Sequence, residues 1–436
     1  MKKPLDLVYI LKKEVIPALG CTEPIAVALA AATAKSKVKG QIKSIKIDVS
    51  PNIYKNGMAV GIPGVNKVGL EIAAALGAIA GNPSLKLEVL ANITPDKVKQ
   101  AIALTEKGNI EVDINCDNGN LYIDVEVITE EGVGKCKIKN RHEDICCIEV
   151  NGKVIFENKL DGETEKGYIK QLQKTSITEI IKSIEEIPYE DIEFLLEGAK
   201  MNKAIAKVGL EEGLGMGVGA SILQNIKKGI LADDIFQRTV LLTAAGSDAR
   251  MSGYQMPVMS SAGSGNHGLT AILPVVAVAE MKEVSEEKLA RALAISHLVT
   301  VYIKSFTGNL SALCGCAVAA ATGASVAIVW ILGGNYLQMG GTIKNMVADV
   351  TGVICDGAKT GCAFKLSTAA AVALKSALLA LDDVIATPDN GIVTDSVEQT
   401  IKNLGRIGTP GMVETDREIL EVMMEKNKLK IIETVC

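Results

Sequence analysis

Three cysteines, Cys314, Cys355 and Cys362, lie in Gly- and Ala-rich sequence that carries almost no charge. Thiolates are the usual protein ligands of iron-sulfur clusters. Three of them could bind three irons of a cubane cluster and leave the fourth iron open to the sulfur of a substrate. The spacing alone is equally consistent with packing, because the chain has no C-x-x-C pair and a buried free cysteine commonly behaves as a small hydrophobic residue.

Glycines beside these cysteines favour the cluster interpretation. Cys355 and Cys362 are separated by a segment rich in glycine, which lets the backbone approach a bulky inorganic group. Two helical turns, or a helix plus a loop, would point both sulfurs the same way. Cys314 is also followed by glycine, but Cys316 lies two residues further on, so the ligand of that pair stays open. Cys436, the last residue, is either a fourth ligand or a frayed end.

A separate argument applies to Cys21. Thr22 is a good N-cap and Pro24 suits the first turn of a helix, so the thiol is predicted to lie at a helix N-terminus. Free backbone N–H groups and the helix dipole there favour the thiolate, which can act as a base or a nucleophile. Glu23 opposes this effect with its negative charge. The alternative is a short turn between helices in which the cysteine is incidental.

Two polar loops are candidate binding sites for a carboxylate. The segment 50–57 contains Asn52, Lys55 and Asn56. Lys55 offers a cation, although a lysine in a loop is more often simply solvated.

The second loop, residues 260–268, resembles an anion nest. Successive backbone N–H groups around Gly263 and Gly265, with the side chains of Ser264 and Asn266, could bind a carboxylate. His267 follows directly and is a group that can titrate near neutrality.

The remaining cysteines and histidines are expected to be structural. Cys116 and Cys136 fall on the apolar sides of alternating strands. The others of this group are Cys146 and Cys147 in another strand, His142 in a charged turn and His297 in a helical run.

These residues must be positioned by two kinds of structure. Alternating hydropathy predicts half-buried strands over Ile42–Val49, Leu85–Leu90, Ile110–Cys116 and Leu121–Val127. Hairpins are predicted at 117–120, between the last two of these strands, and at Asn151-Gly152, between 145–150 and 154–156. Helical periodicity is found over 68–80 and 95–105 within this region, and over 5–18, 192–208, 220–230, 287–301, 368–381 and 397–404 outside it.

The predicted fold class is therefore mixed α/β (α+β). Residues 40–165 form a smaller α+β domain with an antiparallel or mixed sheet. Residues 1–39 and 166–436 form a mainly helical cluster-binding domain, with the active site at the interface. The helix over residues 5–18 can pack on the C-terminal helices instead of on the sheet.

Composition excludes some classes of partner. The 436 residues are 48% hydrophobic, enough for one large or two ordinary domains. The net charge of −5 shows no basic excess for binding nucleic acid or an anionic membrane, so a small-molecule substrate is expected. The N-terminal apolar run breaks too early for a secretory signal, which predicts a cytoplasmic protein whose clustered thiols serve metal binding or catalysis.

Residues 305–343 raise the question of a membrane span, since they contain no charged residue or histidine. Their glycines and their Ala, Ser and Cys content give a weak transfer energy to lipid. A buried helix pair is predicted instead.

Long motifs spread over essentially the whole chain resemble those of the L-cysteine desulfidase family. They are Pro17-Ala-Leu-Gly-Cys-Thr-Glu-Pro24, Ser50-Pro-Asn52 with Lys55-Asn-Gly57, Ser247-Asp-Ala-Arg250, Gly263-Ser-Gly-Asn-His-Gly268, Ser311-Ala-Leu-Cys314, and Ile354-Cys-Asp-Gly357 with Cys362. This family is related to the iron-sulfur L-serine dehydratases. The resemblance implies a [4Fe-4S] enzyme, independent of pyridoxal phosphate, that converts L-cysteine to sulfide, ammonia and pyruvate.

By the same resemblance, Cys314, Cys355 and Cys362 would be the metal ligands and Cys21 the catalytic cysteine. The family has Gln where this chain has His267. A C-terminal cysteine such as Cys436 resembles a feature of the related dehydratases.

The implied reaction is a non-redox β-elimination. Lewis-acid activation at the open iron would make sulfide a better leaving group. Cys21 would remove the α-proton while the nest and Lys55 hold the carboxylate, and the 2-aminoacrylate released would hydrolyse to pyruvate and ammonia.

Two alternatives stay open, an iron-sulfur L-serine dehydratase and a cluster-bearing cysteine sensor or sulfur carrier. No DNA-binding motif or basic face supports a sensor. A pyridoxal phosphate lyase is disfavoured, because nothing marks a Schiff-base lysine in a phosphate-binding setting. The sequence is compatible with a homo-oligomer and does not decide the oligomeric state.

Overall fold

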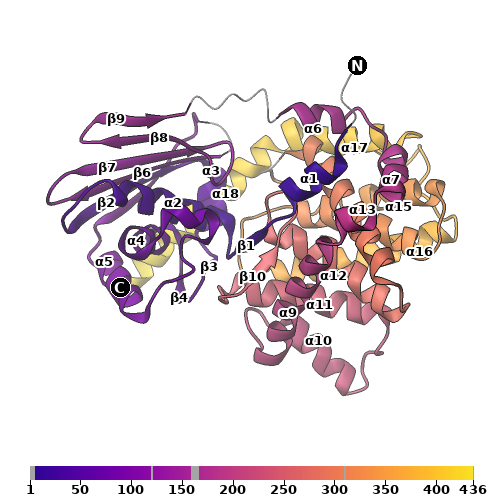
Figure 1. Ribbon diagram of the computed structural model, residues 1–436. Helices are drawn as coiled ribbons and strands as arrows, with labels where there is room; N and C mark the ends of the chain where they lie inside the picture. The colour runs from indigo at the N-terminus through magenta and orange to yellow at the C-terminus, as the bar shows by residue number, and fades with distance from the viewer. Residues whose placement is uncertain (1–4, 119–120, 159–165, 309–310, 436) are drawn as a thin grey trace.

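The computed structural model describes residues 5–118, 121–158, 166–308 and 311–435 (Figure 1). Cys436 and residues 309–310 lie outside the described residues, so the prediction for the terminal cysteine is not addressed. The buried apolar side chains fall mainly into two clusters, one in an α+β part and one in a helical part. The mixed α/β class predicted from the sequence is confirmed.

The α+β part is built on a six-stranded mixed sheet with the order β5-β2-β6-β7-β8-β9. Its strands are β2 (Ile42–Val49), β5 (Ile110–Ile114), β6 (Tyr122–Thr129), β7 (Val133–Lys139), β8 (Ile145–Val150) and β9 (Lys153–Glu157). Strand β2 pairs parallel with β5 and antiparallel with β6, and every other pairing in this sheet is antiparallel. Alternate residues of β2, including Ile45, Ile47 and Val49, are buried on one face, as the period of a half-buried strand requires.

Helices cover that apolar face of the sheet (Figure 1). They are α2 (Thr22–Ser36), α4 (Leu70–Ala80) and α5 (Pro95–Glu106), beside the smaller elements α3 (Pro51–Gly57), β3 (Gly61–Ile62) and β4 (Val65–Val68). The Ala-rich α2 crosses α4 closely: a Cβ on Gly77 would lie 2.2 Å from the carbonyl oxygen of Ala28. Because α2 belongs to this core, the α+β part begins before residue 40. Whether the two parts are independent domains stays a prediction.

Two expectations for this region are wrong. Residues 85–90 are not a strand, because they lie largely in η1 (Pro83–Glu88), where Lys86 has a φ of 51°. The segment 117–120 does not join a hairpin, because β2 lies between β5 and β6. Alternating hydropathy shows which face a strand buries but not which strand is its neighbour. The hairpin of β8 and β9 is confirmed, with positive φ at Asn151 and Gly152, as a tight turn requires.

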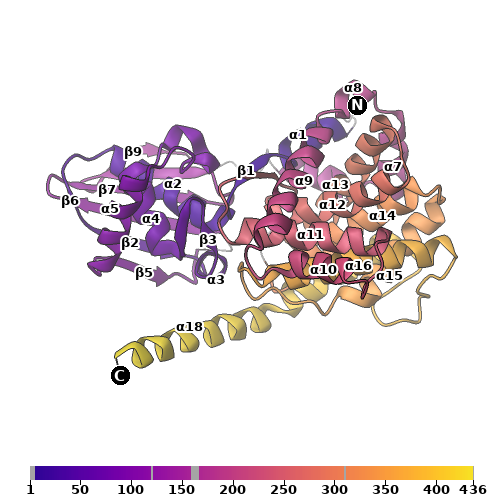
Figure 2. The same cartoon turned by 90° about the horizontal axis from the view of Figure 1, so that it is seen from below.

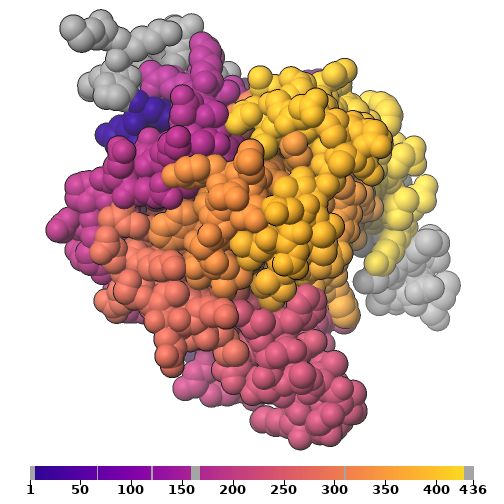
Figure 3. Space-filling model, turned by 90° about the vertical axis from the view of Figure 1, so that its right-hand side faces the viewer, coloured from indigo at the N-terminus to yellow at the C-terminus, as the bar shows by residue number. Residues whose placement is uncertain are grey.

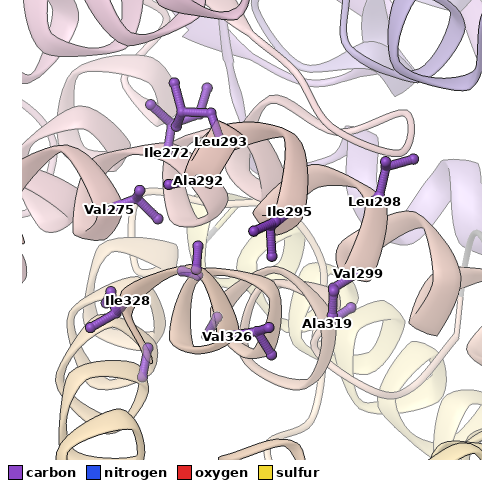
Figure 4. Close-up of a cluster of buried hydrophobic side chains, with 14 of the residues drawn as sticks. Ile272, Val275, Ala292, Leu293, Ile295, Leu298, Val299, Ala319, Val326 and Ile328 are labelled. Atoms are coloured by element: carbon purple, nitrogen blue, oxygen red, sulfur yellow. The ribbon is translucent and has the colours of Figure 1, made fainter. Parts of the chain in front are cut away.

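The helical part packs around α12, α13 and α14, whose apolar side chains interdigitate (Figure 4). Its elements are α1 (Leu7–Glu14), α6 (Lys166–Leu172), α7 (Ile177–Glu186), α8 (Tyr189–Ile192), α9 (Leu195–Glu212), α10 (Val218–Lys227), α11 (Ile235–Met251), α12 (Gly265–Met281), α13 (Glu286–Thr307), η2 (Cys316–Ala320), α14 (Ala321–Ile331), α15 (Tyr336–Val350), α16 (Cys362–Leu381), α17 (Val397–Arg406) and η3 (Ile407–Gly411). Helix α1 packs here, as expected, and is followed by β1 (Pro17–Leu19), which pairs with β10 (Pro257–Met259).

Helices α11 and α12 were not predicted from the sequence, because a helix buried on nearly all sides carries no amphipathic stripe.

Two described helices, α13 and α16, are long and apolar enough to cross a membrane, but much of each is packed inside the protein. The apolar stretch is 78% buried in α13 and 50% buried in α16, as core helices are. The predicted helix pair within residues 305–343 corresponds to α14 and the first half of α15, which pack on each other.

The C-terminal segments connect the two parts. They cover part of one face of the helical part, shown in yellow in Figure 3. The last helix, α18 (Val413–Val435), then runs out alongside the α+β part (Figure 2) and contacts α3.

Candidate active site

A cavity of about 620 Å³ lies where the two parts meet. The α+β part contributes the turn between β7 and β8 and the start of α2, and the helical part contributes α11, the start of α12, the end of α13 and the three cysteine segments. The lining includes nearly all the predicted site residues: Cys21, Asn56, Ser264, Asn266, His267, Cys314, Cys355 and Cys362. Asn52 and Lys55 are not among the described residues that line it.

A short backbone bridge brings two of the cysteine segments together. Leu313 and Ile354 pair antiparallel, so that the N–H of Cys314 donates to Val353 O at 2.9 Å and the N–H of Cys355 donates to Ala312 O at 2.6 Å. Cys314 and Cys355, which follow Leu313 and Ile354 in the chain, are thereby held on two adjacent backbone segments.

Cys362 completes this group from the first turn of α16. Its N–H donates to Lys359 O at 2.9 Å, which leaves it at a helix N-terminus beside the loop that carries Cys355. This is the combination of a helix and a loop that the sequence allowed. Gly357 in that loop has a φ of +90°, and a Cβ there would lie 2.3 Å from the carbonyl oxygen of Lys55, so the close approach requires glycine.

Cys316 also lines the cavity, at the start of η2. A hydrogen bond between the two thiols lowers the pKa of Cys314 to about 6 and raises that of Cys316.

The chemistry of this donor set fits an iron-sulfur cubane. Cys314, Cys355 and Cys362 face one cavity. Within the described part of the chain, however, no three Cys, His, Asp or Glu side chains are close enough to hold a single metal ion. A cubane needs a wider set, because each thiolate binds a different iron. Burial raises the pKa of Cys355 and raises that of Cys362 to about 11, so the positive charge of bound metal would be needed to deprotonate them.

Lys304, at the end of α13, is a buried cation facing these thiols. Burial lowers its pKa to about 8, and the charges of Cys355, Cys316 and Cys314 oppose that shift. An ammonium group here balances negative charge on the thiolates.

Cys21 lies at the start of α2, as predicted, but it is itself the N-cap residue and Thr22 is the first helical residue. Its thiol donates to Met251 Sδ at 3.7 Å. The expectation that the helix terminus favours a thiolate is wrong for this structure. Burial raises the pKa of Cys21 to about 12, opposed by Arg250 and reinforced by Glu23 and Cys362. Desolvation of a fully buried thiol outweighs the partial charge of a helix end.

Arg250, on α11, is the buried cation beside Cys21. It donates from Nη2 to Gly20 O at 2.8 Å and from Nη1 to Asn266 Oδ1 at 3.0 Å. Its Nε has no hydrogen-bond partner in the described structure. A substrate carboxylate is the kind of acceptor that this guanidinium would bind.

The loop interpreted as a nest forms a tight turn, and its binding of an anion stays a prediction. Ser261 and Ser264 form a bridge around Gly263, which has a φ of +76°, and Ser264 and Asn266 line the cavity. His267 does not titrate near neutrality, since burial and the charge of Lys304 lower its pKa to about 3. It is a neutral ring packed against Gly315, where a Cβ would lie 2.4 Å from its Nε2.

Lys55 is not among the described residues that line the cavity, although its positive charge opposes the rise in the pKa of Cys355. Its side chain is 2% exposed and forms an ion pair with Asp416 of α18. Asn52 is buried beside it on α3, with an Oδ1 atom that has no partner among the described residues. The prediction that Lys55 holds the substrate carboxylate is therefore not supported by its position. Asp416 of α18 balances the charge of Lys55. Nothing near Lys55 in the sequence indicates this pairing.

Sequence reasoning missed four polar residues of the site: Glu23, His142, Arg250 and Lys304. Arg250 was recognisable within the motif Ser247-Asp-Ala-Arg250, and Lys304 as a charge at the end of an otherwise apolar helix. No local signal connects His142 with Glu23, because the turn and the helix are far apart in the chain.

Comparison with known proteins defines the class of this site. The chain matches the family described as serine dehydratase alpha chain over residues 84–421 and belongs to that family. The matched range contains Cys314, Cys355 and Cys362 and begins after Cys21. Members of the family are typically iron-sulfur dependent, which places this chain among dehydratase-like lyases.

Similar proteins match over nearly their whole length. A UPF0597 protein of Clostridioides difficile (strain 630) is 47% identical over 423 residues, 96% of this chain and 99% of that protein. A UPF0597 protein of Alkaliphilus metalliredigens (strain QYMF) is 49% identical over 419 residues, 95% of this chain and 94% of that protein. One of Clostridium botulinum (strain Okra / Type B1) is 41% identical over 428 residues, 97% of this chain and 99% of that protein.

Proposed function

We propose that this protein is an L-cysteine desulfidase, a [4Fe-4S] carbon-sulfur lyase that works without pyridoxal phosphate. The observation that carries the proposal is that Cys21 shares one cavity with Cys314, Cys355 and Cys362. A cysteine that could accept a proton as its thiolate thus shares a cavity with three candidate ligands for a metal cluster. When bound, the cluster would supply Lewis-acid activation of the leaving sulfur at the iron that no cysteine holds.

The side chains of the chain itself bind and orient the amino acid. Arg250 and the nest residues Ser264 and Asn266 receive the carboxylate, which fixes the Cα beside Cys21. Cys21 accepts the α-proton at Sγ as a thiolate, so it must first release its own proton to water. The positive charge of Arg250 favours this loss, and burial of the thiol opposes it.

The walls of the cavity keep the reaction away from bulk water. Leu313 and Leu366 line it beside the cysteines and are almost completely buried. Release of the aminoacrylate product into water is then followed by its hydrolysis to pyruvate and ammonia, which needs no further catalytic group.

An iron-sulfur L-serine dehydratase is the second candidate, and the family to which the chain belongs favours it directly. The same cavity would take a hydroxyl in place of the thiol. A soft thiolate is a better ligand for iron of a cluster than a neutral alcohol, and the motif around Cys21 resembles the desulfidases. We therefore rank cysteine above serine.

The test is a paired assay on protein purified without oxygen. Iron and acid-labile sulfide are measured per chain, and then sulfide release from L-cysteine is compared with pyruvate release from L-serine. A larger kcat/KM for cysteine supports the proposal. A larger value for serine assigns the dehydratase, and tight binding of cysteine without turnover assigns a sensor or carrier.

A further inference from the structure

We propose that Glu23 and His142 form a binding site for the α-ammonium group of the substrate, opposite the Arg250 site for its carboxylate. This inference rests on the proposed function in taking the ligand to be an amino acid. It assigns a role to a wall of the cavity that the elimination chemistry does not use.

Glu23 is a buried carboxylate in the first turn of α2, two residues after Cys21. Its Oε1 accepts from Asn56 Nδ2 at 3.1 Å and its Oε2 accepts from Thr22 Oγ1 at 3.1 Å. These neutral donors hold the carboxylate in one orientation without neutralising it. No lysine or arginine lies within ion-pair distance of it in the described structure, so a cationic ligand is the partner that this buried carboxylate lacks.

His142 approaches Glu23 from the turn between β7 and β8. Its Nε2 is buried, has no hydrogen-bond partner in the described part of the chain, and lies 4.0 Å from Glu23 Oε1. That distance is too long for a hydrogen bond. It suits a ligand nitrogen that lies between them and donates to both His142 Nε2 and Glu23 Oε1 at about 2.9 Å.

The ring can act as an acceptor. Burial lowers the pKa of His142, Arg141 adds to that effect, and Glu23 opposes it. A neutral imidazole with its proton on Nδ1 presents a lone pair at Nε2. An ammonium group, with three donors and one positive charge, matches a carboxylate and an imidazole lone pair.

The two charged sites line the same cavity as Cys21. Both Arg250 and Glu23 act electrostatically on its thiol, one lowering and one raising its pKa. A zwitterion bound with its carboxylate at Arg250 and its ammonium at Glu23 places the Cα between them, next to the thiol. The substrate class is therefore an α-amino acid, and a hydroxy acid or a simple thiol lacks one of the two contacts.

The experiment measures binding of two truncated analogues to the anaerobically purified holoenzyme by isothermal titration calorimetry. Cysteamine has the thiol and the ammonium without the carboxylate, and 3-mercaptopropionate has the thiol and the carboxylate without the ammonium. Glu23→Gln should weaken cysteamine by about tenfold or more, because a charged hydrogen bond is lost, and should change 3-mercaptopropionate by less than about threefold. Arg250→Gln should weaken 3-mercaptopropionate by about tenfold or more and should change cysteamine by less than about threefold.

The matched control is Glu143→Gln. Glu143 also lines the cavity from the same turn, but it faces its own cation, Lys86, at 3.6 Å. The Glu143→Gln substitution should leave the affinity for both analogues unchanged. If Glu23→Gln does not fold, His142→Gln provides the test, because it leaves the start of α2 intact and should also weaken cysteamine selectively.

Equal weakening of both analogues by Glu23→Gln, or no weakening of cysteamine by either variant, overturns the ammonium site. The calorimetry needs no turnover. The selective pattern can therefore be found even if serine proves the better substrate, and its absence leaves the lyase assignment standing.

Discussion

Arg250 donates a hydrogen bond of 2.8 Å to the backbone carbonyl of Gly20, across 230 positions of the chain. This contact fastens α11 of the helical part to the residue that precedes Cys21. Cys21, the cysteine expected to accept the α-proton, lies at the start of α2 in the α+β part. The contact holds it beside the helical part, which carries the three expected cluster ligands.

Cys21→Ala should retain iron and lose turnover by about 10²- to 10⁴-fold, the usual contribution of a general base. The iron content should not change, because Cys21 is separate from the bridge that holds Cys314 and Cys355. Iron analysis and sulfide release measure the two quantities. Cys116→Ala is the control, since Cys116 is exposed and its loss should affect neither. Full activity in Cys21→Ala would remove the base assignment.

Cys355 and Cys316 should behave differently on substitution. Cys355→Ala should lose the cluster, whereas Cys316→Ala should keep it, because the proposed ligand of the Cys314 segment is Cys314 itself. Iron and acid-labile sulfide per chain are the readouts. Loss of iron in Cys316→Ala to the same extent as in Cys355→Ala would make Cys316 a ligand.

Arg250 and Lys55 should differ in their effect on substrate binding. Arg250→Gln should raise KM for L-cysteine by about 10- to 100-fold, the value of a lost charged hydrogen bond. Lys55→Gln should change KM by less than about threefold, because its contribution to binding is at most indirect. Steady-state kinetics on folded variants decide between them. A larger KM effect at Lys55 would restore it as the carboxylate ligand.

The ion pair of Lys55 with Asp416 should stabilise the docking of α18. Asp416→Asn leaves a buried ammonium without its counter-ion, which should lower the free energy of unfolding by about 3 kcal/mol. Glu414→Gln is the matched control on the same helix. Glu414 pairs with Arg417 at the surface, where an ion pair contributes about 0–1 kcal/mol. Urea unfolding measures both, and equal stability of the two variants would show that the pair contributes little.

His297 should make folding sensitive to acid. It is fully buried on α13 with Nδ1 2.9 Å from Ser261 Oγ, and burial lowers its pKa to about 3. In the unfolded chain the pKa is about 6.5, so below that pH the unfolded state takes up a proton that the folded state does not. The resulting stability is complete above pH 6.5 and is lost towards pH 3, by about 1.4 kcal/mol per pH unit.

His297→Gln removes this one contribution. The variant should be less stable at neutral pH, because a packed side chain is changed, but its free energy of unfolding should fall less steeply between pH 6.5 and pH 4.5. His142 and His267, whose pKa values are also lowered, remain in both proteins. Urea unfolding at several pH values gives the slopes, and an unchanged slope would contradict the assignment.

Local sequence was a good guide to elements that are half exposed. Strand β2 and helices α10 and α17 alternate between core and solvent, and the sequence of a helix or strand with one apolar face shows the period of that element. Segments buried on every side have no such contrast. That is why α11 and α12 were not delimited, although they carry Arg250 and the nest residues.

For the site, the set of candidate reactive groups could be predicted without the fold: cysteines next to glycines, a cysteine at a helix start, and a nest ahead of α12. Residue types and local backbone freedom depend on neighbouring positions in the chain. Which of these groups lie together depends on the folded structure. It paired Lys55 with α18, set Arg250 beside Cys21, and brought His142 to Glu23, because burial and charge pairing depend on neighbours that are distant along the chain.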